Sequence, residues 1–129
     1  MRNPLIAVVD DDPSVRKSLE RLLKAASFEA TTFASARDFL ERGELTPAPE
    51  CLILDIHLGG MNGFELYEHL AAAGSAVPVI FITAYDDAPT RERARKIGLS
   101  GYLRKPFEQH ALLGAIYRAL KHENDSLIA

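Results

Sequence analysis

The chain has 129 residues, of which 47% are hydrophobic and 26% charged, and it carries a net charge of −3 with a pI near 5.8. This length suits one globular domain and is too short for two. The acidic balance excludes a dedicated nucleic-acid binder, which carries a basic surface and a high pI. The single cysteine, Cys51, excludes an internal disulfide and is expected to be buried, and no apolar run is long enough to span a bilayer. We therefore expect a cytoplasmic protein with no membrane contact.

Five short segments are predicted as strands. Leu5–Val9, Leu52–Leu54 and Val79–Ile82 are nearly continuous apolar runs, which is typical of strands covered on both faces of a parallel sheet. Glu29–Phe33 alternates polar and apolar residues, as an outer strand does, and Gly101–Arg104 gives the weakest of the five signals.

A segment of helical periodicity follows each predicted strand. Asp12 and Ser35 are the expected N-caps of the first two helices, and Gly74 and Gly98 are expected to end the third and fourth. The predicted helices are Pro13–Ala26, Ser35–Arg42, Gly63–Ala73, Pro89–Ile97 and Glu108–Lys121. Five strand–helix pairs in succession predict an α/β domain, with a parallel sheet covered by helices on both faces.

Chemically active side chains fall where four of these strands end. In such a sheet the functional site lies outside the carboxyl ends of the strands, so these side chains are expected to meet at one edge. They are Asp10, Asp11 and Asp12 after the first strand, Asp55 after the third, Thr83 after the fourth and Lys105 after the fifth.

Neighbouring carboxylates at one edge need compensation, because each raises the pKa of the others. Lys105 is one remedy, and a cation bound by carboxylate oxygens is the other. Such a ligand set suits Mg²⁺ (or Mn²⁺), which often binds beside phosphate oxygens. A carboxylate that faces Mg²⁺ and a lysine can attack a phosphoryl group. Taken one at a time, each residue also has an ordinary structural explanation: Asp12 as a cap, Asp55 in a turn, Lys105 in a solvated loop.

Four motifs together resemble the receiver domain of bacterial response regulators. They are VVDDDP at Val8–Pro13, LILDIHLGGMNGFEL at Leu52–Leu66, FITA at Phe81–Ala84 and GYLRKPF at Gly101–Phe107. The resemblance covers roughly residues 4 to 121 and is strongest to receivers joined to transcription factors of the nitrogen-fixation-regulator type. It implies a doubly wound, flavodoxin-like (βα)5 fold with strand order 2-1-3-4-5. We place the receiver domain at residues 1–122 and a tail or the start of a linker at 123–129.

The resemblance implies a role for each matching residue. Asp55 resembles the phosphoacceptor, Thr83 the hydroxyl that turns toward the phosphoryl group, and Lys105 the lysine that pairs with a phosphoryl oxygen. Pro106 matches a proline that usually follows a cis peptide bond, and Tyr102 matches an aromatic switch residue. The implied metal ligands are Asp10 (largely through water), Asp11, Asp55 and the backbone carbonyl of His57.

The sequence departs from the family pattern near the phosphoacceptor. Gly59 stands where the family usually has proline, and with Gly60 it is expected to loosen the loop. His57 and Tyr85 occupy the positions that tune hydrolysis of the acyl phosphate in this family. Both are bulky, so we predict slow self-dephosphorylation.

The expected function is a phosphorylation-activated switch rather than an enzyme with turnover. The implied donor is a sensor histidine kinase or a phosphotransfer protein, and the output face is Pro89–Lys121, with homodimerisation on activation as a family expectation. Two alternatives remain: a dehalogenase-type phosphatase, which needs a second aspartate where His57 stands, and a receiver that serves only as a scaffold. Whether the domain acts alone or controls a DNA-binding partner domain is open.

Overall fold

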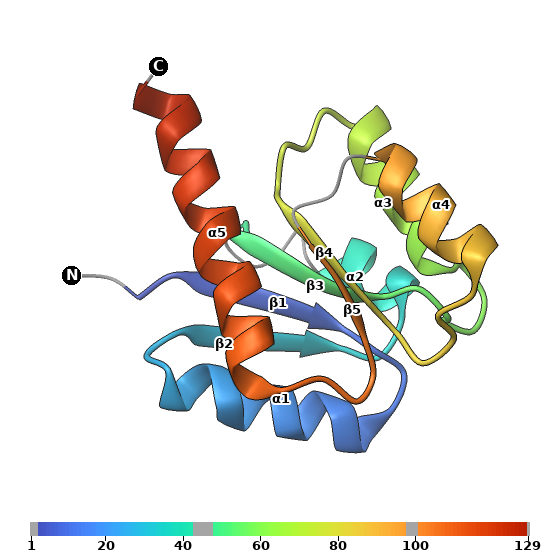
Figure 1. The fold of residues 1–129 in the computed structure, drawn as a ribbon, viewed down its shortest axis with the longest axis horizontal. Helices are drawn as coiled ribbons and strands as arrows, with labels where there is room; N and C mark the ends of the chain where they lie inside the picture. The colour runs from blue at the N-terminus through green and yellow to red at the C-terminus, as the bar shows by residue number, and fades with distance from the viewer. Residues whose placement is uncertain (1–2, 43–47, 98–100, 129) are drawn as a thin grey trace.

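A computed structural model describes residues 3–42, 48–97 and 101–128 and shows five parallel strands in the order β2-β1-β3-β4-β5 (Figure 1). The flavodoxin-like fold and the strand order are therefore confirmed. The strands are β1 (Leu5–Val9), β2 (Glu29–Phe33), β3 (Cys51–Asp55), β4 (Val79–Thr83) and β5 (Gly101–Arg104). The helices are α1 (Pro13–Ala25), α2 (Ala36–Arg42), α3 (Gly63–Ala72), α4 (Ala88–Ile97) and α5 (Gln109–Ile128).

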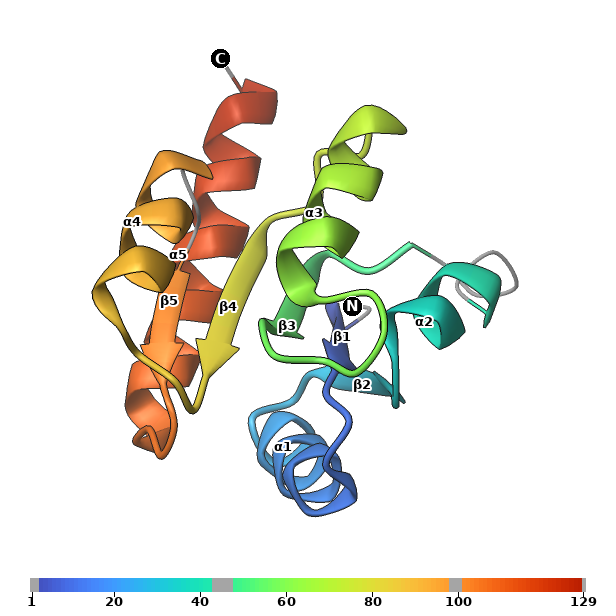
Figure 2. The same cartoon turned by 90° about the vertical axis from the view of Figure 1, so that its right-hand side faces the viewer.

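The helices cover both faces of the sheet (Figures 1 and 2). Successive residues of a strand point to opposite faces, so β1 contributes to two cores. Ile6 and Val8 pack with side chains of α1 and α5, whereas Ala7 and Val9 pack with side chains of α2, α3 and α4. This two-sided burial explains why the central strands are apolar throughout, and it leaves Cys51 buried as expected.

The register of the strands places their carboxyl ends side by side. Asp55 lies opposite Ile82, and Thr83 lies opposite Arg104. A backbone hydrogen bond of 2.7 Å from Lys105 N to the Thr83 carbonyl extends this ladder by one residue. The side chains that follow β1, β3, β4 and β5 therefore share one edge of the sheet.

The two predicted N-caps are confirmed, and each helix begins within one residue of its predicted start. The Asp12 carboxylate accepts a hydrogen bond from Ser14 N, and the Ser35 hydroxyl accepts one from Asp38 N. Gly74 follows α3 with φ +83°, a conformation that favours glycine. The expected helix end at Gly98 lies outside the described residues.

The last helix is longer than expected. We predicted an end at Lys121, but α5 runs to Ile128 (Figure 1). No proline, and no glycine after Gly114, interrupts the segment, so nothing in its sequence ends the helix earlier. The domain boundary at residue 122 stays a prediction. None of the helices, as far as the structure describes them, combines the length and apolar character needed to cross a bilayer.

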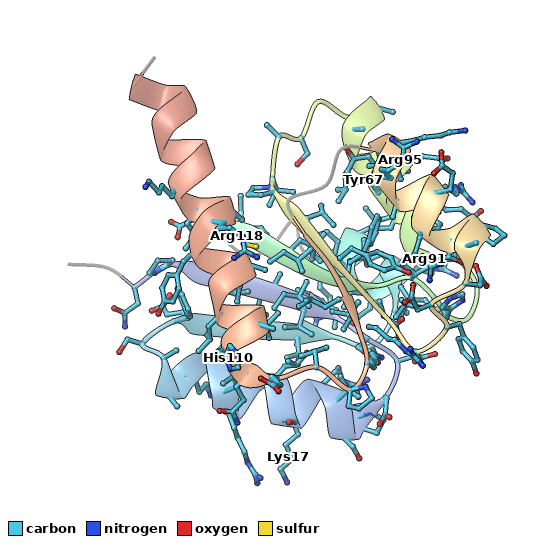
Figure 3. All side chains as sticks on the ribbon, viewed as in Figure 1. Lys17, Tyr67, Arg91, Arg95, His110 and Arg118 are labelled. Carbon is cyan, nitrogen blue, oxygen red and sulfur yellow. The ribbon has the colours of Figure 1, made fainter. Side chains whose placement is uncertain are left out.

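Helix α4 differs from the others in how little of it is buried. Ala94 is its single buried residue, and Ile97 is half-buried. Most of its other side chains are charged; Arg91 and Arg95 are labelled in Figure 3. Apolar packing therefore contributes little to the position of α4.

Candidate functional site

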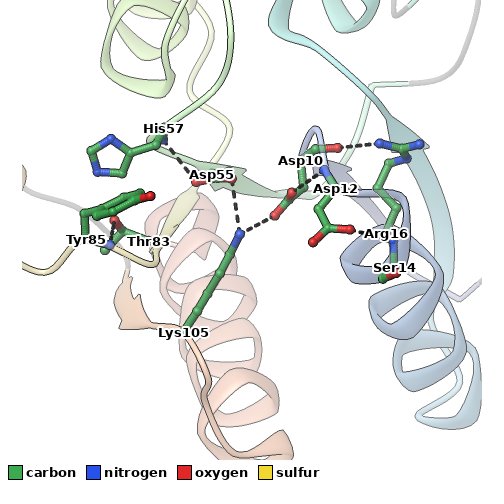
Figure 4. A network of polar contacts seen from close by, with 9 residues as sticks. All are labelled: Asp10, Asp12, Ser14, Arg16, Asp55, His57, Thr83, Tyr85 and Lys105. Carbon is green, nitrogen blue, oxygen red and sulfur yellow. Dashed lines mark hydrogen bonds and ion pairs between the residues drawn. The ribbon is translucent and has the colours of Figure 1, made fainter.

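The candidate site lies at the carboxyl edge of the sheet, between the ends of β1, β3 and β5 (Figure 4). Among the described residues, the buried polar or charged ones are Asp10, Asp55 and Thr83. All three were predicted as site residues. Burying a carboxylate costs free energy unless it is paired, so two buried aspartates side by side need a specific partner.

Lys105 is that partner. Its Nζ lies 2.7 Å from Asp10 Oδ2 and 3.2 Å from Asp55 Oδ2, and its side chain is only 19% exposed. One ammonium thus bridges two carboxylates from different strands. The bridge shows that the segment after β5 delivers its lysine to the same point as β1 and β3.

Backbone amides complete the hydrogen bonding of both aspartates. His57 N donates to Asp55 Oδ1 over 3.0 Å, and Asp12 N donates to Asp10 Oδ1 over 2.9 Å. The Arg16 guanidinium donates to the backbone carbonyl of Asp10 over 2.8 Å (Figure 4). Both carboxylates are therefore fixed in orientation before any ligand binds.

The pKa values of the pair reflect burial and mutual charge. Burial raises the pKa of the Asp55 carboxyl, the nearby Asp10 raises it further, and the His57 amide and Lys105 oppose the rise. Burial alone would lower the pKa of Lys105, but its hydrogen bonds and ion pairs with Asp10 and Asp55 outweigh burial, so that pKa is raised. Lys105 is thus a permanent cation in the site, whereas Asp55 is a carboxylate whose charged form is disfavoured.

The acidic group fits a divalent cation. One carboxylate oxygen from each of Asp10, Asp11 and Asp55 lies within 4.8 Å of the other two, and Asp11 is exposed to solvent. An all-oxygen donor set with access for water suits Mg²⁺, which keeps several water ligands. The predicted residues are therefore placed where they could hold one ion together.

Thr83 ends β4 beside Asp55 and is fully buried. Its Oγ1 accepts a hydrogen bond of 2.9 Å from Tyr85 N, which closes a tight turn at the start of the next loop. The Tyr85 ring packs edge-on against the His57 ring, with 4.9 Å between centroids. These two rings stand side by side next to Asp55 (Figure 4).

Tyr102 and Pro106 lie beside the acidic group rather than within it. The Tyr102 hydroxyl donates a hydrogen bond of 3.0 Å to Asp86 Oδ1 in the loop between β4 and α4. The peptide bond between Lys105 and Pro106 is cis, as the resemblance implied. Pro106 and Lys105 also line a groove of about 510 Å³ between α1 and the start of α5, together with Val15, Leu19, Phe107 and neighbouring residues.

Sequence reasoning missed the role of Gly63. A Cβ at this position would lie 2.5 Å from the backbone oxygen of Asp55 and 2.8 Å from the Cα of Ile56. Gly63 N also donates to the Ile56 carbonyl over 2.9 Å. Only glycine lets α3 begin this close to the end of β3. The Asn62–Glu65 capping box marks the helix start in the sequence, but nothing there indicates the backbone contact.

An open α/β sheet with buried, lysine-bridged aspartates at its carboxyl edge defines a class of domain: the doubly wound α/β domain with an acidic pocket. Within that class, the response regulator receiver domain matches residues 6–117 of this chain. The chain belongs to this family. Receiver domains are regulatory phosphoacceptor domains rather than classical enzymes, and response regulators receive their phosphoryl group from histidine kinases.

Some of the curated relatives are named transcriptional regulatory proteins. The chain is 36% identical over 119 residues to nodulation protein W of Bradyrhizobium diazoefficiens, covering 92% of this chain and 52% of that protein. It is 35% identical over 116 residues to the transcriptional regulatory protein FixJ of Azorhizobium caulinodans, covering 89% and 54%. The expected likeness to nitrogen-fixation regulators is thus confirmed, and the chain spans about half the length of the curated relatives it matches.

Solved structures show the same fold. The response regulator StyR superposes with a TM-score of 0.85 at 45% sequence identity, over 96% of this chain and 62% of that one. The comparisons establish the family and the fold. The role of each site residue in this chain rests on the geometry above.

Proposed function

We propose that this receiver domain accepts a phosphoryl group on Asp55 from a phosphohistidine donor, in a reaction that requires Mg²⁺ (or Mn²⁺). The observation that supports this most directly is the buried Asp55 carboxylate, which Lys105 and the His57 amide hold at a shared acidic site. An Asp55 oxygen attacks phosphorus while the bond from phosphorus to the donor nitrogen breaks. The electron pair remains on the donor imidazole, and Asp55 becomes an acyl phosphate.

The surrounding side chains are placed to stabilise the negative charge on the oxygens of the transferred phosphoryl group. Asp10, Asp11, Asp55 and the His57 carbonyl would hold the cation, which supplies positive charge to the phosphoryl oxygens when bound. Lys105 Nζ, at 3.2 Å from Asp55 Oδ2, is placed to bind one of those oxygens. Thr83 would reorient its hydroxyl toward another. Phosphorylation thereby changes hydrogen bonding near the ends of β4 and β5. The added charge would favour one of two arrangements of this region over the other.

The output is proposed to lie on the face formed by Pro89–Lys121, with Tyr102 and Pro106 responding to the movement of Thr83. Homodimerisation through this face is proposed from the family resemblance alone, and control of transcription is proposed from the similarity to the transcriptional regulatory protein FixJ. A cytoplasmic location is proposed because phosphohistidine donors of this family act there.

Intact-mass spectrometry after incubation with acetyl phosphate tests the phosphoacceptor. We expect a gain of one phosphoryl group with Mg²⁺, none with EDTA, and none in Asp55→Asn. Asp38→Asn, which alters an exposed ion pair with Arg42 on α2, is the matched control and should be phosphorylated normally. Phosphorylation of Asp55→Asn would refute the assignment, and repeated turnover of a phosphoester would favour the phosphatase alternative.

The His57–Tyr85 ring pair supports slow loss of the phosphoryl group. The two rings contact each other beside Asp55. We propose that they hinder the approach of an attacking water to the acyl phosphate. His57→Ala and Tyr85→Ala should each shorten the half-life of the acyl phosphate severalfold. Because the rings touch, the effects of the two substitutions should not add. The double variant should lose its phosphoryl group at about the rate of the faster single variant.

A further inference from the structure

Asp86 is the point at which three elements of the molecule meet. It lies in the loop between β4 and α4, and its side chain is 18% exposed. Its Oδ1 accepts hydrogen bonds from the Tyr102 hydroxyl of β5 at 3.0 Å and from Arg91 Nη1 of α4 at 3.1 Å. Arg91 Nη1 also lies 3.2 Å from the Asp86 carbonyl oxygen. One carboxylate thus ties β5, α4 and the loop together.

The start of α4 does not need Asp86. The neighbouring Asp87 caps that helix, since its Oδ1 accepts from Thr90 N over 2.8 Å and its carbonyl accepts from Arg91 N over 3.0 Å. The Asp86 carboxylate is therefore left to tie Tyr102 and Arg91. Because α4 buries only Ala94, this tie adds to the few contacts that hold the helix, which include the packing of Ile97 and the contacts of Arg93 with Phe64 and Glu68.

Asp86 also lies close to Thr83 along the chain. In this structure Thr83 Oγ1 accepts from Tyr85 N, so the loop is folded back on the threonine. Turning that hydroxyl toward a phosphoryl group on Asp55 opens this turn and shifts the residues that follow. A hydrogen bond of 3.0 Å does not survive a displacement of about 1 Å unless its partner follows. Tyr102 must then either move with the loop or lose its acceptor.

We propose that Asp86 is a positioning residue that binds Tyr102 and Arg91 and so stabilises the unphosphorylated arrangement of β5 and α4. This inference rests on the proposed function, because it assigns a cost to the rearrangement that phosphorylation drives. Breaking the tie removes that cost. By reciprocity, the loosened protein binds a phosphoryl group or its mimic more tightly.

The surroundings of the tie support this role. The Tyr102 ring packs against the buried cluster on the α3–α4 side of the sheet, and its hydrogen bond to Asp86 is partly buried. Burial and the Asp86 carboxylate together raise the pKa of Tyr102 to about 12. The phenol therefore remains a hydrogen-bond donor throughout the neutral range.

Beryllofluoride, a phosphoryl mimic, tests the inference when titrated with Mg²⁺ and followed by amide NMR. Asp86→Ala and Tyr102→Phe should each raise its apparent affinity about fivefold or more, as expected for a typical coupling between sites. The double variant should gain little beyond either single one, because both remove the same hydrogen bond. Glu92→Gln, which removes only an ion pair with Arg95 on the same helix, is the control and should bind like the wild type.

Unchanged or weaker binding of beryllofluoride by both single variants would overturn the inference. A substitution that merely damages the fold would weaken binding, so tighter binding is not explained by a structural defect. The phenol gives a second readout: in Asp86→Ala the pKa of Tyr102 should fall toward its ordinary value of about 10, and an unchanged pKa would also overturn it. Failure of the proposed function looks different, because the wild type itself would then neither bind beryllofluoride nor accept phosphate on Asp55.

Discussion

The two halves of the sheet are stabilised in different ways. On the side of β1 and β3, α1 buries Leu19 and Leu23 in the core, and Phe28 follows it. On the side of β4 and β5, α4 buries Ala94 and is held mainly by polar contacts. Arg93 illustrates them: its guanidinium lies 4.4 Å from the centre of the Phe64 ring and 3.1 Å from Glu68.

The difference in packing corresponds to two functional requirements, a rigid pocket and an element that can move. The acidic pocket needs fixed geometry, and Asp10 and Asp55 follow strands that are packed by apolar side chains on both faces. A responding element needs two arrangements of similar free energy, and partly exposed ion pairs hold an element more weakly than apolar burial does. Within the proposed output face, α4 is therefore the helix that costs least to rearrange.

The largest expected contrast is between core truncations in the two halves. Leu23→Ala in α1 should lower the free energy of unfolding by about 3 kcal/mol, because it leaves a cavity at a fully buried site. Ile97→Ala in α4, at a half-buried site, should cost about 1 kcal/mol. Urea denaturation measures both, and equal losses would contradict the contrast.

Gly63→Ala probes the rigid half at the pocket itself. The added methyl group would meet backbone atoms of Asp55 and Ile56, so we expect a loss of about 2 kcal/mol and slower phosphorylation of Asp55. Gly74→Ala is the matched control: its positive φ costs about 1 kcal/mol, but its Cβ meets no atom within 4 Å. Phosphorylation of the Gly74 variant by acetyl phosphate should be normal.

Asp55→Asn should separate function from stability. Burial and Asp10 raise the pKa of Asp55 in the folded state, so folded protein holds this proton to higher pH than unfolded protein. Ionised Asp55 therefore destabilises the metal-free fold at neutral pH, and the variant should show a higher urea midpoint there. As the pH falls through the raised pKa the wild type regains stability, so the difference should disappear.

Mg²⁺ should make the wild type more stable than Asp55→Asn, which reverses the order expected without the ion. At a concentration of about 100 times its Kd, the ion stabilises a binding-competent fold by about 2.7 kcal/mol. Asp55→Asn has lost one of the three grouped carboxylates and should gain less. Equal stabilisation of both proteins by Mg²⁺ would mean that Asp55 is not a ligand.

The smallest expected effect concerns Arg93, which contacts α3 from α4. Arg93→Met should cost less than about 1 kcal/mol of global stability, because its ion pair with Glu68 is half exposed. Amide exchange should nevertheless become faster in α4 and stay unchanged in α1. Faster exchange in both helices would show that the two halves are not independent.

The alternation of apolar runs and helical periods was sufficient to predict a parallel α/β sheet, whereas the strand order followed from the resemblance to receiver domains. The alternation also placed Asp10, Asp55, Thr83 and Lys105 at one edge, since strand ends in a parallel sheet must meet there. The structure brings these side chains together as predicted. The end of α5 was wrong by several residues because a polar helical turn looks like a tail when no breaker marks its end.

Other contacts could not be predicted from the sequence, because they depend on tertiary geometry. The Arg16 bond to the Asp10 carbonyl spans six residues and follows from how α1 leaves the pocket. The tie between Asp86 and Tyr102 joins residues sixteen positions apart. Neither spacing corresponds to a local motif, so neither contact has a sequence signal.

The Lys105 bridge also has a kinetic consequence. With Asp10, Asp11 and Asp55 ionised, one lysine leaves the pocket with two uncompensated negative charges. A phosphodonor is itself an anion, so the metal-free pocket repels it at close range. A divalent cation held by these carboxylates would remove that repulsion. We therefore expect the cation to bind first and the donor second.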